Sequence, residues 1–381
     1  MKIKSLLLLV FFGVSWHEDL LGSESIVGGF LPYWKAKDGI ASFKNHYRYF
    51  DQASPFSYDV DDSGHIIDRF SRKKGEWNRF TVFCHKHHIK IVPTLFWNNP
   101  EALHRCLSHT QKMVSHSDEI MRIIAKDNVD GICIDYENID PQDRVYFADF
   151  LKYISLKLHE KKLVLYCCVE GRISDYSTGL FVAKGKRAQS EKKVSVETPS
   201  RLGTPQAIRR FKKVCANYCD QIIIMGYDEW GLPYLYSNRD YAKQYFISHA
   251  SMAWLKRVLR YFLGFVPDKK LVLGIPTYGL DFIIYSMNRH DIELKKHKAL
   301  SFPSIQDLLR QYGCVPRRTS GRELALTYAA DNLLHYVCYL DAQAIKDRID
   351  LARDFKIKGV YFFKIDGLED PAMWSILSEK V

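Results

Sequence analysis

The fold is decided by the stretch Val129-Asp-Gly-Ile-Cys-Ile-Asp-Tyr-Glu-Asn-Ile139, a short apolar run that ends in acidic side chains. Its isoleucines and its length predict an inner strand of a parallel sheet, because strands buried between two layers are nearly all apolar. Side chains of a strand alternate between its faces, so Cys133, Asp135 and Glu137 share one face. The two carboxylates then lie about 7 Å apart along the strand, since each residue advances the chain by about 3.3 Å.

This pair of acids has two interpretations. Like charges in a low dielectric make each other harder to ionise, so one pKa rises. A glutamate whose pKa rises from about 4.3 toward about 6 can protonate a glycosidic oxygen near neutral pH. Alternatively, the acids cap the following helix or pair with basic side chains at the strand end. The stretch by itself leaves both interpretations open.

Apolar runs of strand length recur along the chain and alternate with helical patterns. After the central stretch, Asp140 as N-cap and Pro141 in the first turn predict a helix start. Apolar residues from Phe147 to Leu158 then recur every three or four positions. The alternation predicts an α/β fold, a (β/α)8 TIM barrel, with the acids at the C-terminal end of a strand. The other predicted strands cover residues 25–34, 49–58, 89–96, 162–169, 220–228, 270–279 and 358–366.

The last two predicted strands are separated by about eighty residues, which exceeds a normal crossover. We therefore expect an inserted subdomain between strands 7 and 8, at about residues 280–341. At 381 residues the chain is long enough for one barrel with such an insertion, and 47% hydrophobic residues can form its core.

The N-terminus has the pattern of a signal peptide. Lys2 and Lys4 precede an almost wholly apolar run from Leu6 to Val14, and polar and small residues follow as far as Ser23. The run is too short to span a bilayer, and no other segment is long enough to try. We expect a signal peptide at residues 1–24, a barrel at residues 25–381, and an exported protein with no stable membrane span after cleavage. An uncleaved anchor is the alternative.

Cysteine and charge patterns give further expectations. Nine cysteines are an odd number, and no disulfide framework is predicted. A zinc site is one interpretation of Cys215 and Cys219 together with His85, His87 and His88. No second matched pair of ligands accompanies them, so no metal is expected.

The net charge of +11 is concentrated in residues 184–187, 191–193 and 209–213, in and after one predicted loop. This loop is either solvated or in contact with an anionic cell-wall glycan. No nucleic-acid motif occurs, and we expect a monomer without cofactors.

A resemblance to a known family appears at the central stretch. Asp130-Gly-Ile-Cys-Ile-Asp-Tyr-Glu137 resembles the D-G-x-D-x-D-x-E signature of glycoside hydrolase family 18, the chitinase and N-acetylglucosaminidase family. It departs at Cys133, where the family has an aspartate that exchanges a proton with the next one. Branches related to spore-cortex lytic enzymes and to the lysosomal di-N-acetylchitobiase also lack an acid there, so the departure does not argue against activity.

Other segments resemble the same family. Met225-Gly-Tyr-Asp228 is similar to its M-x-Y-D motif, and Lys270 to Gly279 is similar to its K-L-V-L-G-x-P-x-Y-G pattern. His335 to Asp341 resembles the H-x-V-W-Y/F-x-D segment of the chitobiase-like and cortex-lytic branches. The resemblance covers nearly the whole predicted mature chain. It implies that the inserted subdomain between strands 7 and 8 is a small α+β insertion.

The resemblance implies a substrate-assisted mechanism with retention of configuration. Glu137 would protonate the leaving oxygen and then act as the base for water. Asp135 would orient the substrate's 2-acetamido group, and Tyr227 would hydrogen-bond its oxygen. The implied substrate-binding residues are Asp130, Tyr33, Trp34, Met225, Asp228 and Phe363. Phe363 stands where the family usually has a tryptophan, and packing in the core is the alternative for Tyr33 and Trp34.

The implied substrate is a β-linked N-acetylglucosamine glycan. The cortex-lytic resemblance, the signal peptide and the basic loop favour peptidoglycan in a bacterial envelope. A chitobiase-like role on chitin-type glycans or N-glycan cores is a second possibility. A non-catalytic chitinase-like lectin is the alternative in another class: such proteins typically lose the acid at the position of Glu137, which this chain retains, whereas Cys133 and Phe363 keep that alternative open.

Overall fold

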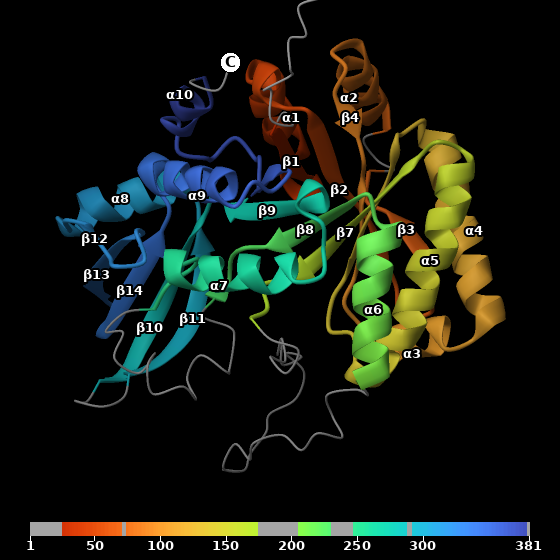
Figure 1. The fold of residues 1–381 in the computed structure, drawn as a ribbon. Coiled ribbons are helices and arrows are strands. Elements are labelled where there is room, and N and C mark those ends of the chain that lie inside the picture. The colour runs from red at the N-terminus through yellow and green to blue at the C-terminus, as the bar shows by residue number, and fades with distance from the viewer. Residues whose placement is uncertain (1–24, 71–73, 174–204, 230–246, 288–291, 379–381) are drawn as a thin grey trace, which may run out of the picture.

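The computed structural model describes residues 25–70, 74–173, 205–229, 247–287 and 292–378. In these residues a closed parallel barrel is surrounded by helices (Figure 1). The barrel closes because β1 pairs in parallel with both β15 and β2. Its strands are β1 (Ile26–Pro32), β2 (Gln52–Val60), β5 (Thr94–Trp97), β6 (Gly131–Tyr136), β7 (Val164–Glu170), β8 (Gln221–Met225), β9 (Leu271–Pro276) and β15 (Gly359–Phe363). The predicted (β/α)8 barrel is confirmed.

The third predicted strand is divided in two. β4 (Lys90–Ile91) and β5 both pair in parallel with β2, and Pro93 lies between them. Proline has no N–H to give to a sheet, so the ladder is interrupted there. A short strand, β3 (Ile66–Asp68), adds antiparallel to β2 after a turn in which the Gly64 N–H donates to the Asp61 carbonyl at 3.1 Å.

The barrel interior and its outer surface are both packed with apolar side chains, as expected for a sheet covered by helices. On β6, Cys133 faces the interior with Tyr166 and Tyr361, whereas Ile132 and Ile134 belong to the core between sheet and helices. This alternation is the one predicted for the central stretch. It fixes which side chains can reach the mouth of the barrel.

The outer helices bury their apolar stripes against the barrel. After β6, a 3-10 turn at Pro141–Asp143 precedes the helix, which begins at Arg144, later than predicted. The Asp140 side chain makes no capping hydrogen bond, so its predicted role as N-cap of this helix is wrong. The helices around the barrel are α1 (Ala36–Asn45), α2 (Lys74–Lys86), α3 (Pro100–Leu107), α4 (Thr110–Asp127), α5 (Arg144–Glu160), α6 (Pro205–Tyr218), α7 (Met252–Leu263), α9 (Ala342–Asp354) and α10 (Met373–Ser378).

Between β9 and β15 the chain forms a second, antiparallel sheet, on the left of Figure 1. This is the part of the sequence in which an α+β insertion was expected. Leu280, Phe282 and Cys338 are buried beside Tyr278 and Ile247, where the second sheet meets the barrel. Its elements are β10 (Gly279–Met287), β11 (Ile292–Leu300), α8 (Phe302–Tyr312), β12 (Arg317–Arg318), β13 (Leu324–Ala330) and β14 (Leu333–Tyr339).

Several expectations lie outside the described residues, among them the signal peptide at residues 1–24 and the basic segments at 184–187 and 191–193. All nine cysteines are free thiols. In the described part of the chain, no helix is both long enough and apolar enough to cross a membrane.

Candidate active site

Asp135 projects from β6 into the mouth of the barrel, on the face that it shares with Cys133. Its side chain is 5% exposed. Burial, and then the charge of Glu170, raises its pKa to about 7. Its Oδ1 atom is buried and has no hydrogen-bond partner in the described structure. A buried carboxylate oxygen of this kind can accept a hydrogen bond from a polar ligand.

Glu137 follows the last residue of β6. Its backbone N–H donates to the Trp97 carbonyl at 2.8 Å, which fixes it at the strand end. Its side chain lines a pocket that is open to solvent, together with Glu170. Burial raises the Glu137 pKa well above its usual range, and the charges of Asp135, Glu170 and Asp228 raise it further. The raised pKa favours the protonated form of Glu137, which is the form that a general acid needs.

The loop after Glu137 is held in place locally. Asn138 adopts a left-handed backbone conformation, with φ of 56°. Its side-chain amide donates to the Asn98 side chain in the loop after β5. Asparagine tolerates this conformation better than most residues, so the chain can turn sharply away from the strand directly after the acid.

Tyr227 and Phe363 lie together at the mouth. Their rings stack with centroids 5.4 Å apart and planes 19° apart. Burial raises the Tyr227 pKa well above its usual range, with smaller contributions from Cys168, Tyr278 and Asp135 among others. The Tyr227 hydroxyl therefore keeps its proton and can donate a hydrogen bond to a substrate.

Phe363, at the end of β15, is fixed by its neighbour strand. The Thr277 N–H donates to the Phe363 carbonyl at 2.9 Å. The Thr277 hydroxyl bonds both the N–H and the carbonyl of Lys364, at 2.9 and 2.6 Å. The phenyl ring is thereby held at the rim, where it offers a sugar an apolar surface.

Tyr33 and Trp34 follow β1, in a 3-10 turn at Tyr33–Lys35. Trp34 is 50% exposed, and its ring lies 6.0 Å from that of Phe56. The Phe56 ring lies 6.2 Å from that of Phe363. Aromatic rings thus continue across the mouth from Trp34 to Tyr227. An exposed indole at this rim is available to a ligand, whereas Tyr33 is only partly exposed and contacts the Trp34 ring edge-on at 5.0 Å.

Met225 and Asp228 come from the end of β8 and the turn beyond it. Met225 pairs with Glu170 across the strands and lines the same pocket as Glu137. Asp228 has a φ of 58°, and its Oδ1 accepts a hydrogen bond from the Tyr278 hydroxyl at 3.3 Å. Both residues lie at the predicted mouth.

Asp130 lies at the opposite end of β6 from Glu137. Its Oδ2 accepts a hydrogen bond from the Ile91 N–H at 2.7 Å and lies 3.2 Å from the His85 Nε2. It precedes Asp135 by five positions along the strand, about 16 Å at the usual rise. The structure does not bring Asp130 to the mouth, so we replace its predicted substrate contact with a structural role in joining β4 to β6.

Three residues of the site were missed in the sequence. Glu170 ends β7 two positions beyond Cys168, so the same alternation that selected Asp135 could have selected it. It forms an ion pair with Arg172 at 2.7 Å. Tyr278, which contacts Asp228, is the tyrosine of the K-L-V-L-G-x-P-x-Y-G pattern and could have been selected from it. His249, which also contacts Asp228, carried no local signal.

No group of three or more His, Cys, Asp or Glu side chains in the described residues could hold a metal ion. The residues at the mouth form a site built from two acids with raised pKa values at the end of one strand, a tyrosine hydroxyl and an aromatic wall. This combination is typical of a glycosidase that handles sugar rings.

Comparison with known proteins gives the same class. Residues 56–367 match the family described as "Glycosyl hydrolases family 18". Because the match spans most of the chain, the protein belongs to this family and is a glycosidase.

Two relatives and one solved structure illustrate the likeness. An "Uncharacterized glycosylase YvbX" of Bacillus subtilis (strain 168) is 22% identical over 72% of this chain and 67% of its own length. A "Cortical fragment-lytic enzyme" of Bacillus anthracis is 23% identical over 68% of this chain and 51% of its own length, so the chain spans about half of that relative. A family 18 chitinase from Cycas revoluta, solved with (GlcNAc)3, is 17% identical with a TM-score of 0.68, covering 93% of this chain and 99% of that one.

Proposed function

We propose that the protein hydrolyses β-linked N-acetylglucosamine glycans, with peptidoglycan as substrate, by substrate-assisted retaining catalysis. The observation that carries this proposal is the arrangement on β6. Glu137, whose pKa burial raises well above its usual range, lies beside a buried Asp135 whose Oδ1 has no hydrogen-bond partner in the described structure.

The first step needs a proton donor and an internal nucleophile. Glu137 donates its proton to the glycosidic oxygen, and the carbonyl oxygen of the 2-acetamido group attacks the anomeric carbon as the glycosidic bond breaks. Asp135 accepts a hydrogen bond from the acetamide N–H and stabilises the positive charge of the oxazolinium ion. The Tyr227 hydroxyl donates a hydrogen bond to the acetamide oxygen and holds that oxygen against the anomeric carbon.

The second step regenerates the enzyme. The ionised Glu137 takes a proton from water, which attacks the anomeric carbon and releases the acetamide oxygen. The sugar leaves with its original configuration. Asp135 and Glu170 come from adjacent strands on one side of the mouth, so neither faces Glu137 across the scissile bond as a conventional nucleophile would.

The substrate class is supported by the relatives and by charge. The name of the Bacillus anthracis relative refers to fragments of cortex, and the Cycas chitinase was solved with an N-acetylglucosamine trimer. A net charge of +11 favours an acidic polymer over neutral chitin.

We also propose that the protein is exported through residues 1–24. N-terminal sequencing of the protein from its native host should find a start near residue 25, and an intact Met1 would refute cleavage.

The test compares wild type with Glu137→Gln on purified peptidoglycan and on chito-oligosaccharides, with products identified by mass. Wild type should release fragments with a reducing N-acetylglucosamine end, and Glu137→Gln should lose at least about a thousandfold in rate. Retention is read by NMR from the first anomer formed. Equal turnover by the two proteins would refute the assignment of Glu137. Binding by wild type without any product would instead support the lectin alternative.

A further inference from the structure

Asp228 is held by contacts that come from outside the barrel. Its φ of 58° is a conformation that an aspartate adopts only when its surroundings favour it. The Asp228 backbone N–H donates to Nδ1 of His249 at 3.1 Å. The Oδ1 atom of Asp228 lies 3.6 Å from the same Nδ1 and accepts a hydrogen bond from the Tyr278 hydroxyl at 3.3 Å.

His249 is fully buried, and its ring is fixed on several sides. Because Nδ1 accepts the Asp228 N–H, that nitrogen carries no proton. The ring packs against the Tyr278 ring at 4.7 Å with an interplanar angle of 64°. The His249 carbonyl accepts a hydrogen bond from the Glu229 N–H at 3.0 Å, so the backbones of the two segments are also joined.

The backbone of His249 is held in turn by the second sheet. Glu323 precedes β13, and its Oε2 accepts the His249 N–H at 2.9 Å. Its Oε1 accepts the Ala250 N–H and lies 3.4 Å from Nη2 of Arg348 on α9. Neither Glu323 nor Arg348 is exposed at all. Arg348 also donates to the Ala250 and Gly321 carbonyls, at 2.7 and 3.0 Å.

A buried ion pair is a poor source of stability, because removing both charges from water costs about as much as their attraction returns. Its best-supported use is to specify one arrangement. The pair of Glu323 and Arg348 specifies the position of His249, which lies directly behind the mouth.

We propose that Glu323 and His249 are positioning residues for the glycosidase reaction, through which the second sheet holds Asp228 in the mouth beside Tyr227 and Glu137. His249 acts only through Asp228, and Glu323 acts only through His249. The inference rests on the proposed function for its kinetic tests and has one test that is independent of activity.

The matched variants are His249→Asn and His249→Leu. Both remove the ring and leave side chains of similar size, but asparagine keeps an acceptor oxygen near the position of Nδ1 and leucine does not. On a fluorogenic β-glycoside of N,N′-diacetylchitobiose, we expect His249→Leu to lower kcat about 10- to 100-fold, since a misplacement of about 1 Å can cost that much. His249→Asn should keep kcat within about threefold of wild type.

The pH profile should also separate the two variants. Glu137 is faced by Asp135 from β6, by Glu170 from β7 and by Asp228 beyond β8. If Asp228 leaves its place in His249→Leu, the basic limb of kcat/KM moves to lower pH. The limb of His249→Asn should stay where it is in wild type. A general loss of stability would lower the rates of both variants without moving the basic limb of either pH profile.

A double-mutant cycle tests whether His249 acts through Asp228. In an Asp228→Ala background, His249→Leu should have no further effect on kcat. An undiminished effect in that background, or equal losses for His249→Asn and His249→Leu, would overturn the proposal.

A measurement without turnover separates this proposal from the proposed function. In Glu137→Gln protein, hydrogen exchange at the Asp228 amide should be about tenfold or more faster with His249→Leu than with His249→Asn. Glu323→Gln should also speed it, because an amide group offers one acceptor where the carboxylate accepts from two N–H groups. If neither His249→Leu nor Glu323→Gln changes the exchange rate, the positioning role is overturned even if wild type cleaves glycan. If the exchange rate changes but wild type cleaves no glycan, only the proposed reaction is refuted.

Discussion

At the level of single residues, the site differs from the family signature in the partner of Asp135. Cys133 replaces an acid, and its sulfur lies 3.5 Å from that of Cys168 inside the barrel. A thiol is only a weak hydrogen-bonding group, so Cys133 does not replace the aspartate as a partner of Asp135. Glu170, which the signature does not contain, raises the pKa of both Asp135 and Glu137 from the neighbouring strand. After burial, which has the largest effect, Glu170 is therefore one of the charges that raise the pKa values of these acids in this chain.

This tuning predicts the effect of Glu170→Gln on the pH profile. Removing the negative charge makes Asp135 and Glu137 easier to ionise, so the basic limb of kcat/KM should move to lower pH. Arg172→Gln is the matched control of opposite sign, because it removes the cation 2.7 Å from Glu170 and should move the limb to higher pH. Initial rates between about pH 4 and about pH 9 measure both shifts. Movement of both limbs in the same direction would contradict this role of Glu170.

The raised pKa of Asp135 also predicts how stability depends on pH. An unfolded aspartate ionises near its ordinary pKa of 3.8, whereas the folded one ionises at about 7. Burial of the protonated form costs little, so the folded state loses stability as pH rises through this interval and no further above it. Asp135→Asn has no such loss. It should be about as stable as wild type at pH 4 and more stable at pH 8, by up to about 4 kcal/mol.

Urea denaturation at the two pH values checks this expectation. Glu119→Gln, a substitution outside the mouth on α4, serves as the control and should show no widening gap. If the difference between Asp135→Asn and wild type is the same at both pH values, Asp135 is not protonated in the folded protein.

At the level of elements, Gly131 explains the glycine in the signature. A Cβ atom added there would lie 2.0 Å from the Val164 carbonyl oxygen of β7. Only a glycine lets β6 and β7 pair this closely where β6 begins. The glycine of the signature therefore allows the two strands to pack at the bottom of the barrel, away from the mouth where substrate would bind.

Gly131→Ala should therefore destabilise the fold, by about 3 kcal/mol or more, because the backbone of β7 cannot yield without loss of strand pairing. Gly75→Ala in α2 is the control, since its Cβ would meet only the end of the Arg79 side chain at 3.5 Å. That substitution should be neutral or stabilising by a few tenths of a kcal/mol. Thermal unfolding measures both, and a stable Gly131→Ala protein would show that the strands can separate at low cost.

Helices and strands with a clear pattern of apolar residues could be predicted from the sequence. Contacts between segments that are distant in the sequence could not. Each apolar run became a barrel strand, because burial on both faces leaves that pattern in the residues themselves. The position of Asp130 could have been derived from strand direction, since a residue before the strand lies at its other end. The contacts of His249 with Asp228 and with Glu323 join segments 21 and 74 residues apart. No local pattern encodes them.

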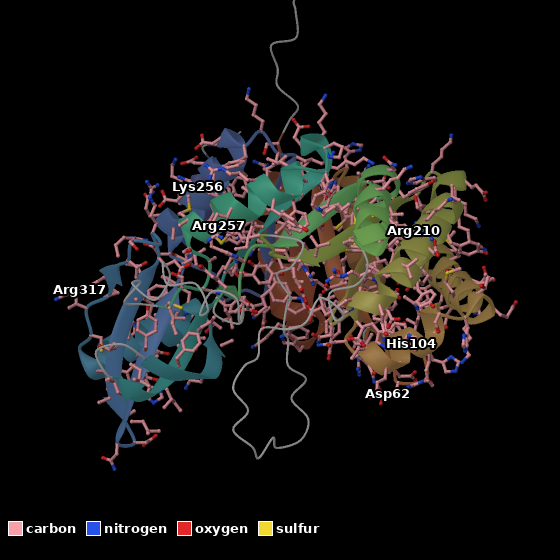
Figure 2. The ribbon with its side chains drawn as sticks, turned by 60° about the horizontal axis from the view of Figure 1, so that its bottom comes forward. Asp62, His104, Arg210, Lys256, Arg257 and Arg317 are labelled. Atoms are coloured by element: carbon pink, nitrogen blue, oxygen red, sulfur yellow. The ribbon has the colours of Figure 1, made fainter. Side chains whose placement is uncertain are left out.

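At the level of the whole molecule, basic side chains are distributed over both parts of the structure. Figure 2 shows Arg210 on the side of α6, Lys256 and Arg257 over α7, and Arg317 at the far end of the second sheet. In the part of the chain that the structure describes, basic side chains are therefore not confined to one segment. A field of this kind acts at long range, and salt screens it.

The charge predicts that binding to peptidoglycan depends on ionic strength. Glu137→Gln protein, which should bind without cleaving, can be sedimented with purified peptidoglycan and with chitin at about 50 mM and about 500 mM NaCl. A net charge of +11 should make the affinity for the anionic polymer fall about tenfold or more across this range. Affinity for uncharged chitin should hardly change, because stacking on rings such as Trp34 is not screened by salt. Salt-independent binding to both polymers would assign recognition to the aromatic wall alone and remove the charge argument for an anionic substrate.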